Sequence, residues 1–264
     1  MTDVSVVVHS EPPVVAQAAA ARLIVRVVDA QTERGWASVV LTGGRIASAI
    51  YTAVRDSPAR DAIDWHRLDL WWGDERFLPA GHPDRNDTQA RAALLDAVPL
   101  DPARVHPMPA SDGAGGDDPE AAAARYASWL ADAALADAER ASAGGPDGHG
   151  PVPSFDVLML GIGPDGHVAS LFPGLPALGD SRPVVAVRDS PKPPPTRLSL
   201  TLPSLQAARE VWILASGAEK ADAVALALTG TGPEGAAPVP AAGARGRQRT
   251  LFLLDRAAAA KVPA

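Results

Sequence analysis

The stretch Phe155-Asp156-Val157-Leu158-Met159-Leu160-Gly161 indicates the type of fold. Apart from its second residue, it is an apolar run of strand length that stops at a glycine. Such a run is typical of a strand that is covered on both faces, as in a parallel sheet with helices on each side. We therefore expect a central, buried β-strand over residues 155–160.

Short apolar stretches recur along the chain and alternate with longer segments of helical pattern. One of them, at 37–41, is followed by the turn Thr42-Gly43-Gly44 and by a helical segment that runs to residue 54. This alternation predicts an α/β fold: a doubly wound, mainly parallel, Rossmann-like sheet with helices on both faces. The remaining strands are expected at 4–8 (as a buried strand), 67–72, 197–202, 211–215 and 251–254. The remaining helices are expected at 11–31, 86–97 (with Asn86 as N-cap), 118–140, 219–228 and 257–264.

No internal repeat and no linker divides the chain, so we expect one domain that spans residues 1–264. Two stretches, at 111–117 and 141–154, are rich in Gly, Pro, Ser and Asp. They are expected to be surface loops, because strand and helix patterns resume on either side of each.

The composition bounds the possible functions. With 47% hydrophobic and 21% charged residues, the chain has material for both a core and a polar surface. It has no cysteine, which excludes a disulfide framework, thiol catalysis and a cysteine zinc site, and fits a reducing cytoplasm. No signal-like start and no apolar run of about 20 residues is present, so a cytoplasmic protein without membrane contact is expected. The net charge of −7 argues against a nucleic-acid partner, and no segment reads as an extra exposed apolar face, so we expect a monomer.

Thr42, Gly43 and Gly44 lie between an expected strand and an expected helix. Glycines allow a close approach of the backbone to an anion, and a helix N-terminus offers free N–H groups. The segment fits neither a P-loop nor a GxGxxG motif, so it predicts an anion site or simply a tight turn.

Asp74-Glu75-Arg76 follows another expected strand. Two carboxylates and an arginine can form a buried ion pair or a solvated charge cluster, or they can grip a substrate. The planar guanidinium of Arg76 suits an oxyanion such as phosphate.

The most informative segment is Gly161-Ile162-Gly163-Pro164-Asp165-Gly166-His167, because it turns away from the central strand. An imidazole can accept a proton from water near neutral pH, and a neighbouring carboxylate can orient it. His167 is therefore the candidate general base, with Asp165 as its partner or as a ligand for a substrate hydroxyl; a purely structural histidine is the alternative.

Two later cations are weaker candidates. Arg197 follows a proline-rich loop that could direct it, and Lys220 opens an expected helix, but each taken alone could be a surface charge. The HExxH and GxSxG patterns are absent, so we expect neither a metal site nor a serine nucleophile.

Together these segments resemble the 6-phosphogluconolactonase family. The matching pieces occur in the family's order and cover most of the chain, from residue 4 to about residue 260: LTGG (41–44), WWGDERFLPAGHPDRND (71–87), FDVLMLGIGPDGHVASLFPG (155–174), DSPKPPPTRLSLTLPSL (189–205), VWILASGAEKADAV (211–224) and RTLFLLDRAA (249–258). The resemblance implies a fold related to glucosamine-6-phosphate deaminases. It also implies a cytoplasmic, metal-independent enzyme without cofactor that hydrolyses a sugar-phosphate lactone in the oxidative pentose phosphate pathway.

By position, the resemblance implies that His167 activates water and that Asp165 assists it. The implied substrate-binding residues are Thr42, Gly43, Gly44, Asp74 and Arg76, with Arg197 and Lys220 helping to hold phosphate. Arg45 departs from the family's usual small residue after Gly-Gly, so it either adds a phosphate contact or points to solvent.

Two alternatives stay open. A glucosamine-6-phosphate deaminase would carry an Asn-Glu pair soon after the DGH segment, where this chain has Ser170-Leu171-Phe172-Pro173. A non-catalytic sugar-phosphate sensor could keep the same pocket.

Overall fold

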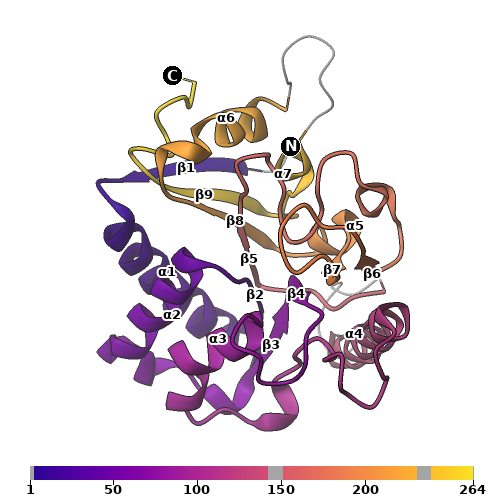
Figure 1. Cartoon of the computed structure of the whole chain (residues 1–264). Helices are drawn as coiled ribbons and strands as arrows, with labels where there is room; N and C mark the ends of the chain where they lie inside the picture. Colours follow the sequence, from indigo (N-terminus) through magenta and orange to yellow (C-terminus); the bar gives the residue numbers. More distant parts are fainter. Residues whose placement is uncertain (1–2, 142–150, 231–238, 264) are drawn as a thin grey trace.

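Six parallel strands form the central sheet of the protein (Figure 1). The computed structural model describes residues 3–141, 151–230 and 239–263. The strand order is β1 (Asp3–His9), β9 (Arg249–Asp255), β8 (Glu210–Ala215), β5 (Val157–Gly161), β2 (Ala37–Leu41) and β3 (Leu68–Trp72). From β2 the chain continues to β3 on one side, and from β5 to β8 and β9 on the other, so the strand order reverses between β2 and β5. This reversal is expected for a doubly wound sheet, and the predicted fold class is confirmed.

The central strand β5 lies between β2 and β8, and the residues from Val157 to Leu160 have no exposed surface. The strand begins two residues later than expected, and Asp156, directly before it, has a separate role. Its carboxylate accepts a hydrogen bond from the Ser38 backbone N–H at 2.9 Å and pairs with Arg34. A buried carboxylate thus joins the start of β5 to the start of β2.

Helices cover both faces of this sheet. On one face, α1 (Pro12–Arg34) packs against α2 (Arg45–Asp56), and α3 (Asn86–Ala93) packs against α2 (Figure 1). On the opposite face lies α4 (Pro119–Ala141), whose Tyr126 contacts Trp71 of β3 edge to face. The shorter helices are α5 (Leu202–Leu205), α6 (Ala221–Thr229) and α7 (Pro240–Gly243). None of the helices in the described ranges is both long and apolar enough to cross a membrane.

A second, antiparallel sheet of three strands was not predicted. It consists of β4 (Asp74–Arg76), β7 (Arg197–Leu200) and β6 (Val184–Val187), in that order. Only Gly73 separates the end of β3 from the start of β4. Arg76 lies opposite Arg197 in the register of β4 and β7. The expected strand at 197–202 therefore exists, but it belongs to this sheet.

Other expectations need correction. The strand at 4–8 is not buried: among the described residues β1 is an edge strand paired with β9 alone, and Val4 and Val8 are 42% and 49% exposed. The expected helix at 257–264 is absent from the described residues of that segment, which form turns. The helix expected at 86–97 ends at Ala93, and a 3₁₀ turn follows (Leu95–Ala97). Residues 142–150 of the expected loop lie outside the described residues, and the number of domains stays a prediction.

Candidate active site

A polar cavity of about 320 Å³ lies where β2, β3, β5 and β8 end. This position is the usual ligand site of open α/β sheets. The lining includes eight of the nine candidate residues from the sequence: Thr42, Gly43, Gly44, Asp74, Arg76, His167, Arg197 and Lys220. The ninth, Asp165, does not line the cavity but contacts His167.

His167 is held in one orientation. Its Nδ1 lies 2.5 Å from Asp165 Oδ1, and its ring packs on Phe172 with the centroids 4.4 Å apart. Protonation of Nδ1 for this contact leaves Nε2 as the basic nitrogen. Gly163 makes the arrangement possible, because a Cβ there would come within 2.0 Å of the His167 ring.

Burial lowers the pKa of His167 below its ordinary value. The contact with Asp165 and the charge of Asp74 act in the opposite direction, whereas the charge of Lys192 lowers the pKa further. For Asp165, partial burial acts to raise the pKa, but the hydrogen bond and charge of His167 outweigh it and the pKa is lowered. Near neutral pH the pair therefore combines a carboxylate with a neutral imidazole.

The loop Thr42-Gly43-Gly44 is fixed from the following helix. The Tyr51 hydroxyl of α2 accepts from the Thr42 N–H at 3.0 Å and donates to the Thr42 carbonyl at 2.7 Å. Gly43 is closely approached by Asn86, since a Cβ there would lie 1.9 Å from the Asn86 Oδ1. The loop leads into the N-terminus of α2 at Arg45, the positive end of a helix beside the cavity.

The two carboxylates of the Asp74-Glu75-Arg76 segment have different roles. Asp74 lines the cavity and accepts a hydrogen bond from the Ser170 hydroxyl at 2.7 Å. Glu75 is fully buried and accepts from three backbone N–H groups. The donors are Arg76 at 2.8 Å, Asn86 at 2.6 Å and Asp87 at 2.9 Å. Glu75 thus fixes the start of α3 rather than gripping a substrate.

Burial raises the pKa of Glu75 to about 7, although the charge of Arg85 and the three N–H donors oppose this shift. Asn86, expected as an N-cap, is instead the first residue of α3. Its side-chain amide donates to the Asp74 carbonyl at 2.8 Å.

The cations that line the cavity differ in their contacts. Arg197 is buried and directs its guanidinium to the carbonyls of Lys192, Pro193 and Pro194, at 3.0–3.2 Å. It therefore organises the proline-rich loop as well as lining the cavity. Arg45 and Lys220 also line the cavity, and a contact of Arg45 with phosphate stays a prediction.

Lys192, Asn86 and Ser170 belong to the site although sequence reasoning did not select them. Lys192 stands among prolines (Pro191 to Pro195). This setting predicted a stiff loop that directs Arg197, but it indicated no role for Lys192. Ser170 reaches Asp74 across 96 positions of sequence, and no local pattern marks such a contact. In the described part of the chain, no group of three or more His, Cys, Asp or Glu side chains could hold a metal ion.

Known proteins resemble this chain in sequence and in fold. Residues 10–253 match the protein family described as glucosamine-6-phosphate isomerases/6-phosphogluconolactonase. A 6-phosphogluconolactonase of Streptomyces coelicolor is 62% identical over 97% of this chain and 94% of its own length. The solved structure of 6-phosphogluconolactonase from Trypanosoma brucei superposes with a TM-score of 0.76 and 30% identity, covering 100% of this chain and 99% of that one. A monomeric glucosamine-6-phosphate deaminase, at 21% identity and a TM-score of 0.71 over 98% of this chain and 100% of its own, shares the fold.

Proposed function

Because the chain belongs to the family of glucosamine-6-phosphate isomerases and 6-phosphogluconolactonases, we propose that it hydrolyses 6-phospho-D-glucono-1,5-lactone with His167 as general base. The enzyme class, a 6-phosphogluconolactonase, rests on the identity with curated lactonases. The observation that carries the assignment of the base is the His167–Asp165 pair at the cavity, which leaves Nε2 basic.

The proposed reaction is the transfer of an acyl group to water. His167 Nε2 takes a proton from water as the oxygen attacks the lactone carbonyl, and a tetrahedral oxyanion forms. Its collapse breaks the bond between the carbonyl carbon and the ring oxygen, which takes the proton back from the imidazolium. The acid product then loses a proton to solvent. Positioned base catalysis of this kind contributes about 10²–10⁴-fold to the rate.

The cationic part of the cavity is the proposed seat of the phosphate. Arg45, Lys192 and Lys220 line it in a protein whose net charge is −7, so the local charge opposes the overall one. Arg76 adds a guanidinium whose Nη1 donates to the Asp84 carbonyl at 2.5 Å. We assign Thr42, Gly43 and Gly44 to contacts with the sugar and Asp74 to a hydroxyl group, while Arg197 holds the Lys192 loop. Phosphate held at a distance from the carbonyl would fix the ring for attack.

The first expected result concerns the substrate. Freshly prepared 6-phosphoglucono-1,5-lactone should open faster with the protein than without it, and chelators should not change the rate. A pH-stat or a coupled dehydrogenase assay, corrected for spontaneous opening, measures this. Release of ammonia from glucosamine 6-phosphate with no lactonase activity would instead establish the deaminase alternative. If neither activity is found, the non-catalytic sugar-phosphate sensor remains as the explanation. We propose a cytoplasmic monomer without metal for this reaction.

A second expected result concerns the phosphate seat. Lys220→Ala should lower kcat/KM for the phosphorylated lactone about ten- to a hundredfold, because a charge-assisted hydrogen bond is lost. Its activity on unphosphorylated glucono-1,5-lactone should not change. Lys261→Ala is the matched control, since that lysine contacts Asp222 at 2.6 Å away from the cavity. Equal losses of kcat/KM on both lactones would show that Lys220 does not bind the phosphate.

A third expected result is a pH profile. The base must be neutral to accept a proton, so kcat/KM should fall as the pH drops through the pKa of His167. Because burial lowers that pKa, the midpoint should lie below the ordinary value of about 6.5. In Lys192→Met the midpoint should rise, because a charge that disfavours the imidazolium is removed. An unchanged midpoint in this variant would contradict the assignment of the fall in kcat/KM at low pH to His167.

A further inference from the structure

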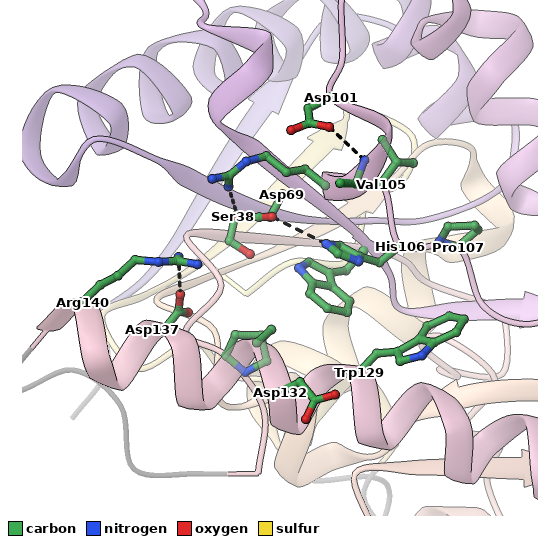
Figure 2. Close-up of a pocket in the computed structure, with 15 residues that line it drawn as sticks. Ser38, Asp69, Asp101, Val105, His106, Pro107, Trp129, Asp132, Asp137 and Arg140 are labelled. Atoms are coloured by element: carbon green, nitrogen blue, oxygen red, sulfur yellow. Dashed lines mark hydrogen bonds and ion pairs between the residues drawn. The ribbon is translucent and has the colours of Figure 1, made fainter.

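A second cavity, of about 600 Å³, lies between β3 and α4 (Figure 2). It shares no lining residue with the candidate active site. Ser38 and Asp69 come from the amino-terminal halves of β2 and β3, whereas the active site lies where the strands end. Its other walls are the segment 101–107 and the face of α4 that carries Trp129, Asp132 and Asp137.

Two buried residues of the lining carry polar atoms without partners. Trp71 is 1% exposed and Ser38 is 3% exposed. The Trp71 Nε1 and the Ser38 Oγ have no hydrogen-bond partner among the described residues. A buried polar atom without a partner carries a desolvation cost, which a bound group would remove. A ligand that reaches these two buried atoms would therefore be stabilised by a hydrogen-bond acceptor that takes the indole N–H and the hydroxyl.

The walls are acidic. Four aspartates line the cavity (Asp69, Asp101, Asp132 and Asp137) against two arginines (Arg104 and Arg140). Each arginine already pairs with one carboxylate: Arg104 with Asp69 at 2.7 Å, and Arg140 with Asp137 at 3.0 Å. Burial, together with the charges of Asp69 and Asp156, raises the pKa of Asp137 to about 6 despite Arg140. The carboxylates thus repel one another, and a further cation between them would be stabilised.

Aromatic rings complete the lining. The His106 ring stacks on Trp71 with the centroids 3.9 Å apart and the planes 14° from parallel. Trp129, on α4, is 36% exposed and presents its indole at the rim. An indole face attracts a cation placed over it, and flat rings stack on it with little loss of conformational freedom.

We propose that this cavity binds a small planar organic cation, of the amidinium or guanidinium class, that also carries an oxygen acceptor. The cation lies between Asp69 and Asp137, where a planar group can form parallel hydrogen bonds to carboxylates. The oxygen reaches Trp71 Nε1 and Ser38 Oγ, and the flat body lies against Trp129. An anionic ligand is disfavoured, because the lining has two more acidic than basic side chains.

The test is calorimetric titration of the full-length protein at pH 7.5 with 4-hydroxybenzamidine, a planar amidinium with a hydroxyl at the far end. Its neutral isostere, 4-hydroxybenzamide, has the same shape without the charge. Saturable binding of one equivalent of the amidinium is expected, at least about tenfold tighter than binding of the amide. The ratio of the amidinium affinity to the amide affinity should fall about tenfold or more in Asp137→Asn. This change is isosteric, and burial already favours the neutral form of this carboxyl.

Two variants locate the binding. Asp61→Asn changes an exposed aspartate elsewhere on the surface and should leave the affinity unchanged. His167→Ala should also leave it unchanged if the amidinium does not occupy the active site. No saturable binding, equal affinity for the amide, or equal affinity of wild type and Asp137→Asn would each overturn the proposal. Loss of binding in His167→Ala would assign the probe to the active site and overturn it as well.

Discussion

His167→Ala is expected to lower kcat for lactone opening by about 10²–10⁴-fold, the usual contribution of a positioned base. The imidazole is the basic group that the structure fixes at the cavity, through Asp165 at 2.5 Å and through the packing on Phe172. Alanine leaves the cavity and its cations in place, so substrate should still bind. The effect should therefore appear in kcat more than in KM. Stopped-flow measurement with fresh lactone separates it from spontaneous opening.

His66→Ala is the matched control, because this histidine is exposed and lies outside both cavities. It should retain the wild-type kcat. Circular dichroism and thermal unfolding should show that His167→Ala keeps the native fold. A folded His167→Ala variant that retains more than about a tenth of the wild-type kcat would show that another group activates water.

Glu75→Ala is expected to cost about 3–5 kcal/mol of unfolding free energy, as is typical when one partner of a buried ion pair is removed. Glu75 lies 3.7 Å from the Arg85 guanidinium and accepts from the backbone N–H groups of Arg76, Asn86 and Asp87. Alanine leaves the buried Arg85 cation without its carboxylate and three backbone N–H groups without an acceptor. Urea unfolding measures the loss.

Glu75→Gln distinguishes the hydrogen bonds from the charge. Its amide oxygen can still accept from Arg76 and Asn86, which both donate to the same carboxylate oxygen. We therefore expect Gln to lose clearly less stability than Ala. Because the native pKa is raised to about 7 from the ordinary value of about 4.3, ionisation of Glu75 disfavours the folded state. The wild type should lose stability as the pH rises between these two values, and Glu75→Gln should not show this loss. Equal losses in the Ala and Gln variants would contradict the role of the backbone contacts.

The sequence alone determined much of the sheet. The apolar run that contains Val157 to Leu160 can be buried on both faces only in the middle of a covered sheet, and the structure has it there. Residues of the loops that follow strand ends, such as Thr42 and His167, could be selected because parallel strands bring their carboxyl ends to one edge. Here local pattern and sheet geometry give the same answer.

Local pattern could not tell Asp74 from Glu75. They are neighbouring carboxylates in one short motif, yet successive side chains of a strand point to opposite sides. As β4 pairs with β7, Asp74 faces the cavity and Glu75 lies under the start of α3. Whether β4 exists depends on β7, which lies more than a hundred residues away in the sequence.

The same distinction applies to the edge strand β1 and to the second cavity. The valines at 4, 6 and 8 indicate a strand, but only the strand order decides that one side of it has no neighbour. The partnerless atoms of Ser38 and Trp71 come from strands whose patterns indicate nothing but burial. Sequence determines what a short segment can form and bury; which side chains meet, and which buried polar atoms lack a partner, depends on contacts between distant segments, and these exist only once the chain is folded.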